Sequence, residues 1–289
     1  MKLANIESAG RSRVAIVLDH ELVDLTAQLG IELDDVSKLR AMGPEARELA
    51  ERCLKRATTR VPVDSVKFLS PILRADKILG VGMNYHSFVA AAERIGVALP
   101  KVRLWFLRPR ACICGPYEKV WLPRDATDLD YEAELAIIIG QRCRHVSAAD
   151  ARAVIAGFTV ANDLTLRDRV LKSIVLGKSF DTHTPLGPWM VTAEEIGDPH
   201  RLAVKTWVNG VLRQNGNTAD MIGQCYELIE EISAVCTLNP GDIILTGTPD
   251  GSGLFCKPPL SLAANDVVKI EIEAIGAIEN RVVDEPAVG

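Results

Sequence analysis

The sequence predicts a strand-rich α+β protein in which a small α/β segment precedes a larger, mostly β domain. Short apolar runs separated by turn residues recur along most of the 289 residues, whereas few stretches have helical spacing. Neither GxGxxG after a strand nor GxxxxGK[ST] occurs, so a doubly wound nucleotide-binding sheet has no support. A proline-punctuated stretch, VPVDSVKFLSPILRADK, separates the two patterns. We therefore expect a small domain over residues 1–72 and the main domain over 73–289.

The first segment combines strands and helices. Residues 1–30 alternate short apolar runs with polar turns, as in RVAIVLDHELVDL, which predicts two or three small strands. Residues 31–58 follow with charges and Leu/Ala spaced as on a helix, as in MGPEARELAERCLKRA. This order is typical of a small α/β unit.

The main domain is dominated by strand-like runs. They include KILGVG, RLWFL, ELAIIIG, GFTVAND, AVKTWVNG, DIILTGTP and DVVKIEIEAIG. A few helices are expected, chiefly around 148–156, 166–175 and 218–236. So many short strands with turn signals favour a closed or rolled sheet.

Composition excludes several classes of function. A net charge of -5 without a basic cluster argues against nucleic acid as a partner. No apolar run has the length of a signal-peptide core or a membrane span, so a membrane partner is not expected. The seven cysteines are scattered and odd in number, a pattern typical of reduced thiols in a cytoplasmic protein.

Three acidic residues provide the strongest sign of chemistry. Glu132 and Glu134 lie two apart at the start of a predicted buried strand, so both side chains point to the same face. Asp163 follows a second strand-like run, GFTVAN. Buried neighbouring carboxylates repel each other, and a hard divalent cation such as Mg²⁺ or Mn²⁺ resolves that conflict. The alternative for the glutamate pair alone is a solvated face of an edge strand.

The chain resembles the fumarylacetoacetate hydrolase family over roughly residues 75–285. The motifs that carry the resemblance are GVGMNY, DYEAELAIIIG, NDLTLRD, GKSFDTHTPLGP, VNGVLRQ, PGDIILTGTPDG and the late ND-VVKIEIEAIG. Each is modest alone, but their common order and spacing make the match specific. The resemblance, to the bacterial type with a short N-terminal domain, implies a mixed β-roll catalytic domain, a divalent metal and a homodimer. It also implies a small 2-oxo or 2,4-dioxo acid as substrate.

The resemblance also assigns roles to residues. It implies that Glu132, Glu134 and Asp163 hold Mg²⁺ or Mn²⁺ and that Lys178 stabilises a developing oxyanion beside them. The residues expected to bind substrate are Tyr85, Arg108, Gln214, Thr246, Gly247 and Thr248. Arg167 and Asp168 are expected to form a structural pair that braces the loop after Asp163.

One motif departs from the family pattern. Hydrolases of the family have a helix reading N-Y-x-x-H-x-x-E, whose His and Glu activate water. Here Phe88 and Ala91 occupy those positions. His86 and His183 are candidate substitute bases, although a packing or surface role is the alternative for each.

Three functions follow as hypotheses. The first is metal-dependent hydrolysis of a C–C bond in a 2,4-dioxo acid of the acylpyruvate or fumarylpyruvate type, in catabolism. The second is isomerisation or decarboxylation of a 2-hydroxy-dienedioate or β-keto acid, which needs no activated water. The third is a family member that binds metal without catalysis.

Overall fold

The computed structural model describes residues 1–42 and 45–287. Most strands join one 12-stranded mixed sheet, with the path β4-β3-β2-β1-β14-β12-β11-β17-β6-β7 and with β5 and β8 paired to β1 and β14. A five-stranded sheet has the order β16-β15-β18-β19-β9, and β10 pairs with β13. The expected strand-rich α+β fold class is confirmed. No helix in the described ranges is long and apolar enough to cross a membrane.

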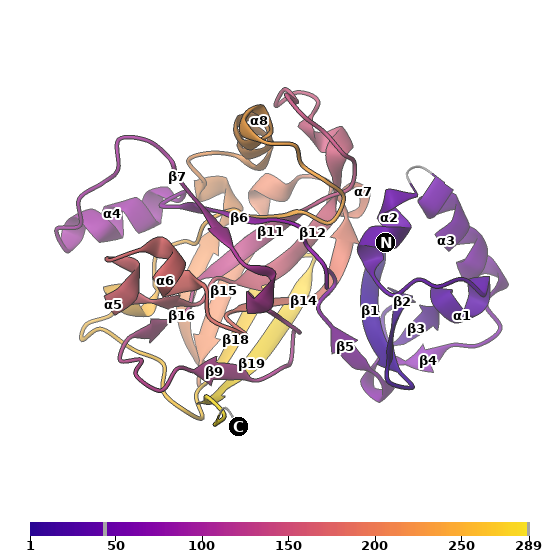
Figure 1. The fold of residues 1–289 in the computed structure, drawn as a ribbon, viewed down its shortest axis with the longest axis horizontal. Coiled ribbons are helices and arrows are strands. Elements are labelled where there is room, and N and C mark those ends of the chain that lie inside the picture. The colour runs from indigo at the N-terminus through magenta and orange to yellow at the C-terminus, as the bar shows by residue number, and fades with distance from the viewer. Residues whose placement is uncertain (43–44, 288–289) are drawn as a thin grey trace.

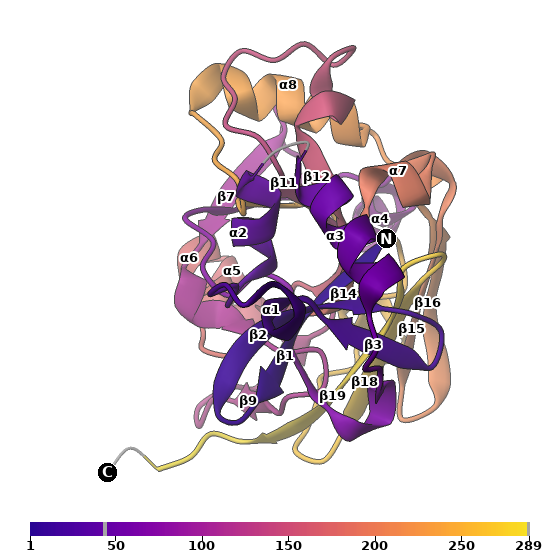
Figure 2. The same cartoon turned by 90° about the vertical axis from the view of Figure 1, so that its right-hand side faces the viewer.

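The N-terminal elements lie together at one side of the molecule (Figure 1). They are β1 (Lys2–Ser8), β2 (Arg11–Val17), β3 (Glu21–Asp24), α1 (Leu25–Leu29), α2 (Val36–Ala41), α3 (Glu45–Arg56), β4 (Val61–Pro62) and β5 (Lys67–Leu69). Buried Asn5 ties the strands to a helix and a loop, because its side chain accepts from the Val36 N–H and donates to the carbonyls of Ser70 and Pro71. Figure 2 views these elements from their own side.

The main sheet continues directly from these strands. β1 pairs antiparallel with β14 (Thr184–Thr192), where Leu3 lies opposite Met190. A shared apolar core also spans both parts of the chain, with Leu3 and Val14 packed in the same cluster as Ile138 and Met190. The expected domain boundary after residue 72 stays a prediction. The main sheet is continuous across this boundary, because β1 is hydrogen-bonded to β14.

The centre of the molecule is built from strands buried on both faces. β11 (Ala133–Ile139) and β12 (Ile155–Asn162) are buried at every residue, as expected for their continuous apolar sequence. The remaining strands of this sheet in the main domain are β6 (Ile78–Gly82), β7 (Leu104–Arg108), β8 (Ile113–Cys114) and β17 (Ile243–Leu245). The helix expected at 148–156 is wrong, because only a 3₁₀ turn forms at Ala151–Val154 and Ile155 already pairs with Ile139 in β12. Pairing in the sheet outweighs the helical preference of the alanine-rich sequence before it.

The second sheet packs against the first through one large core. Its strands are β9 (Val120–Leu122), β15 (Ala203–Val208), β16 (Val211–Asn217), β18 (Val267–Ile272) and β19 (Gly276–Asp284). Alternate residues of β15 and β18 are buried, which is the pattern of a sheet with one face on the core. Val204 and Ile270 from this sheet join Leu135 and Phe158 from the main sheet in that core.

Short helices lie around the sheets (Figure 1). They are α4 (His86–Arg94), α5 (Arg167–Val170), α6 (Ile174–Lys178), α7 (Ala193–Ile196) and α8 (Cys225–Val235). Single 3₁₀ turns occur at Val63–Ser65, Arg110–Cys112, Ala151–Val154, Pro199–Arg201, Thr218–Asp220 and Gly253–Phe255. The paired strands β10 (Leu129–Asp130) and β13 (Thr165–Leu166) lie just outside β11 and β12.

Candidate active site

Strand register brings the three acidic residues together. Ala133 lies opposite Asn162, and the backbone N–H of Asp163 donates to the Glu132 carbonyl at 2.9 Å, so Glu132 and Asp163 also lie opposite each other. Opposed residues of an antiparallel pair point to the same face, as do residues two apart on one strand. Carboxylate oxygens of Glu132, Glu134 and Asp163 consequently lie within 4.8 Å of one another, and all three residues are buried.

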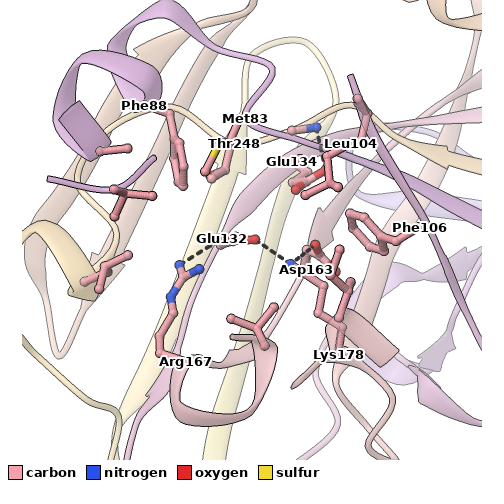
Figure 3. Close-up of a pocket in the computed structure, with 18 of the residues that line it drawn as sticks. Met83, Phe88, Leu104, Phe106, Glu132, Glu134, Asp163, Arg167, Lys178 and Thr248 are labelled. Carbon is pink, nitrogen blue, oxygen red and sulfur yellow. Dashed lines mark hydrogen bonds and ion pairs between the residues drawn. The ribbon is translucent and has the colours of Figure 1, made fainter. Parts of the chain in front are cut away.

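Two cations approach this cluster from opposite sides (Figure 3). Lys178, at the end of α6, donates from Nζ to Glu132 Oε2 at 2.7 Å and also contacts Asp163. Arg167, at the start of α5, donates to the other Glu132 oxygen at 2.7 Å. Burial raises the pKa of Glu132, but the charges of Lys178 and Arg167 outweigh burial and lower that pKa to about 2.

Glu134 has a different environment. Its carboxylate accepts the backbone N–H of Gly247 at 2.7 Å, and within the described ranges it forms no ion pair. Burial and then the charge of Glu132 raise the pKa of Glu134 to about 8. Burying an ionised carboxylate without a cation beside it is unfavourable, so ionised Glu134 would be stabilised by an added positive charge.

The donor set fits a divalent cation. Three converging carboxylates are the oxygen ligands that Mg²⁺ and Mn²⁺ prefer. A cation at this position would also supply the positive charge that Glu134 lacks. The acidic triad could therefore bind metal, through Glu132, Glu134 and Asp163.

The loop after β17 is fixed closely against the triad. Gly247 has a φ of +92°, and a Cβ there would lie 2.8 Å from the Cβ of Asn84, so only glycine fits. The Asn84 side chain donates to the Thr246 carbonyl at 2.8 Å and to the Gly223 carbonyl at 2.9 Å. Asn84 thus holds the Gly247 N–H in place for Glu134.

A cavity of about 330 Å³ opens above these residues. Its charged lining residues, which we call the charged floor, are Glu132, Glu134, Asp163, Arg167 and Lys178. Much of the remaining lining is apolar, and we call apolar wall the residues Met83, Phe88, Val97, Leu104, Phe106, Leu254 and Phe255. Gly247 and Thr248 complete the lining next to Glu134. The cavity therefore has one charged end and otherwise apolar sides.

Several residues predicted to bind substrate lie behind the cavity lining. Arg108 contacts Asp163 and donates to the His183 carbonyl at 2.8 Å. Gln214 donates to Thr248 Oγ1 at 2.9 Å and accepts the Ala133 N–H, so it links the loop to β11. Thr246 donates its hydroxyl to the Leu135 carbonyl at 2.8 Å. These three residues support the site from behind and are not among the residues that line it.

Tyr85 and the candidate bases also lie outside that lining. Tyr85 is fully buried at the start of α4, and His86, the next residue, is exposed. His183 is buried, and its Nε2 lies 2.8 Å from the Trp121 carbonyl. Burial lowers the pKa of His183 to about 4 although that contact opposes the shift, so the ring is neutral near pH 7. The geometry brings neither histidine to the charged floor.

The structure adds residues to those predicted from sequence. Arg167 pairs with Asp130 and Glu132 in place of the expected Asp168, and it lines the cavity. Asp130 is two residues before Glu132, so the i, i+2 alternation in DLDYEAE could have indicated it. The apolar wall comes from three separate stretches of the chain, residues 83–97, 104–106 and 254–255, so no single motif predicts it.

Comparison with known proteins identifies the family of this chain. Residues 77–283 match the family model described as fumarylacetoacetate (FAA) hydrolase C-terminal. The human mitochondrial oxaloacetate tautomerase FAHD2A is 43% identical over 245 residues, which cover 83% of this chain and 77% of that protein.

Solved structures of similar proteins match nearly the whole chain. Maleylpyruvate hydrolase from Sphingobium sp. SYK-6, solved with manganese(II) and pyruvate, matches with a TM-score of 0.84 and 32% identity, covering 99% of this chain and 100% of that one. The 2-hydroxyhepta-2,4-diene-1,7-dioate isomerase from Mycobacterium marinum matches with a TM-score of 0.76, 32% identity and the same coverage. These relatives are named as hydrolase, isomerase and tautomerase. This chain belongs to the fumarylacetoacetate hydrolase family.

Proposed function

We propose that this protein is a divalent-metal-dependent enzyme that interconverts the keto and enol forms of a small 2-oxo acid. One observation carries the proposal. The cavity has a charged floor, but its described wall has no His and Glu pair that could activate water. Phe88 lines the cavity, and Ala91, one turn later on α4, is buried. Tautomerisation moves one proton from C3 to the C2 oxygen and consumes no water.

The charged floor can perform this chemistry. A bound Mg²⁺ or Mn²⁺ would act as a Lewis acid towards the 2-oxo group. Lys178 is the floor residue that we assign to proton transfer between C3 and the C2 oxygen. Burial lowers its pKa, against the opposing charge of Glu132, and a lowered pKa makes an amine a better proton carrier near neutral pH. Thr165 Oγ1, 2.8 Å from Nζ, helps to orient it.

The relatives support the same reaction class. The human and rat proteins that align with most of this chain are named as oxaloacetate tautomerases. The manganese and pyruvate held by the maleylpyruvate hydrolase support a metal and a 2-oxo acid at the corresponding site. Mn²⁺ is therefore as suitable a test metal as Mg²⁺.

Hydrolysis of a C–C bond in a 2,4-dioxo acid, the first hypothesis from sequence, is our second candidate. The likeness to maleylpyruvate hydrolase favours it. Hydrolysis requires a base that deprotonates water. Tautomerisation needs one proton carrier, which Lys178 can provide, whereas hydrolysis also needs a base for water, and the described lining outside the floor contains no histidine or carboxylate for that second task.

One assay separates the two reactions. Enol forms of 2-oxo and 2,4-dioxo acids are mixed with the protein and Mg²⁺ or Mn²⁺, and loss of enol absorbance is followed while products are analysed. We expect faster enol–keto relaxation without release of pyruvate. Release of pyruvate at a comparable rate would establish hydrolysis, and release of CO₂ would establish decarboxylation. No effect on any acid, at saturating metal, would leave the non-catalytic alternative.

The homodimer is also a proposal. β7 is the last strand on the path of the large sheet. Exposed apolar side chains lie on it, on α6 and directly after α5, namely Leu104, Leu107, Leu171, Val175 and Leu176. Such a surface is suited to contact with a second copy. Light scattering that gives the mass of a monomer at micromolar concentration would contradict the proposal.

A further inference from the structure

The apolar wall has a consequence for the part of the substrate beyond C3. Phe88 of α4 packs edge-on against Phe255, with ring centroids 4.9 Å apart and an interplanar angle of 79°. Phe106 and Leu104 of β7 line the opposite side (Figure 3). A substrate whose 2-oxo acid group lies on the charged floor must place its tail against these side chains.

The charges of the floor are nearly balanced within the protein. When all three carboxylates are ionised, as metal binding requires, they face two cations, Arg167 and Lys178, which leaves one negative charge in excess. Behind it, Arg108 contacts Asp163 and Asp130 contacts Arg167, and these two further charges cancel. A divalent metal changes the excess to one positive charge. One substrate carboxylate neutralises it.

A second substrate carboxylate would have no such partner. The cations that line the described cavity are those of the floor, and Arg167 is already bound to Asp130 and Glu132. Arg94, the nearest basic residue along α4, is bound to Asp250 at 2.8 Å and is not part of the lining. Burying an uncompensated carboxylate against phenylalanine and leucine side chains is strongly unfavourable.

We infer that the preferred substrate is a 2-oxo monocarboxylate with an uncharged, apolar tail, and that the apolar wall selects against dicarboxylates. This inference rests on the proposed function, and it departs from the dicarboxylate named for the human and rat relatives. The apolar wall then contributes to specificity, while the floor provides the chemistry that all 2-oxo acids share.

The test uses two acids that differ only at the end of the tail, 2-oxohexanoate and 2-oxohexanedioate. Binding of each to the full-length protein, saturated with Mg²⁺, is measured by calorimetry. Exchange of the C3 protons in D₂O is followed by NMR as the readout of enolisation. We expect 2-oxohexanoate to bind at least about tenfold more tightly, because the dioate must bury an unpaired charge. Equal binding, or tighter binding of the dioate, would overturn the inference.

A matched pair of variants tests the wall itself. Val97 lies in the loop after α4 and lines the cavity, whereas Val102 is 76% exposed in the same loop and does not. V97K adds a cation to the wall and should shift the preference towards the dioate by about tenfold or more. V102K adds the same charge outside and should leave the preference unchanged. An equal shift in both variants would mean that general surface charge sets the preference.

The proposed reaction and the proposed substrate preference can be contradicted separately. If the protein accelerates C3 exchange of the dioate as well as of the monocarboxylate, the proposed function stands and the inference is wrong. If it binds 2-oxohexanoate preferentially but accelerates exchange of neither acid, the selectivity stands and the tautomerase proposal is wrong.

Discussion

The charged floor and the apolar wall of the cavity are built in opposite ways. The triad is fixed by β11 and β12, two central strands that are buried at every residue. The wall is assembled from α4 and the loops on either side of it, the edge strand β7 and the 3₁₀ turn at Gly253–Phe255. Reactive groups must hold their positions closely, and paired central strands provide that rigidity. Elements at the rim can vary in sequence at little cost to the fold, so they suit selection of the substrate tail.

The largest effect should come from the floor residue that lacks a cation. Glu134→Gln keeps the shape and the acceptor for the Gly247 N–H but removes the charge. We expect metal-dependent activity to fall by at least about a hundredfold, roughly 2.7 kcal/mol of barrier. The metal should also no longer raise the melting temperature. Glu93→Gln, an exposed change on α4, serves as control, and wild-type stabilisation by metal in Glu134→Gln would refute the ligand assignment.

Lys178→Met should separate catalysis from metal binding. The ammonium contacts Glu132 and Asp163, so it competes with a metal for the same oxygens. We expect activity to fall by about a hundredfold or more, whereas metal affinity measured by calorimetry should be kept or increased. Parallel loss of both would indicate that Lys178 mainly holds the carboxylates in place.

His183, which lies behind the charged floor, should make the stability of the protein depend on pH. Burial holds its pKa near 4, below the ordinary value of 6.5. The unfolded state therefore binds a proton that the folded state does not, and stability should fall as pH decreases from about 6.5 to about 4. The full contribution is about 3 kcal/mol. Denaturant unfolding of the wild type and of His183→Gln across this range measures it, and identical slopes would contradict the burial argument.

The smallest effect should come from His86. Its side chain is exposed at the start of α4 and lies outside the described lining of the cavity. His86→Asn should change kcat/KM by less than about twofold, since surface changes away from the site have little effect. A loss of tenfold or more, about 1.4 kcal/mol, would show that α4 moves His86 over the floor during turnover.

Much of the site could be predicted from local patterns. The i, i+2 spacing placed Glu132 and Glu134 on one face, and the resemblance added Asp163, Lys178 and the loop at Gly247. Residues whose role depends on distant partners were harder to place. Gln214 and Arg108 carry polar groups that suit a pocket wall, yet their hydrogen bonds run to backbone groups, to Thr248 and to Asp163, and neither residue lines the cavity. Arg167 was expected to pair with its neighbour Asp168 and instead reaches Asp130 and Glu132.

The sequence by itself determined the strand-rich fold class, the family and the acidic residues, because strand periodicity and motif order are local properties of the chain. Only the tertiary structure decided which acid lacks a cation, which polar residues face the cavity and what surrounds the tail of a substrate. Those properties depend on the register between β11 and β12 and on the approach of α4, α5, α6 and β7 to the same point. Burial and charge balance are sums over neighbours that lie far apart in sequence, so no local pattern contains them.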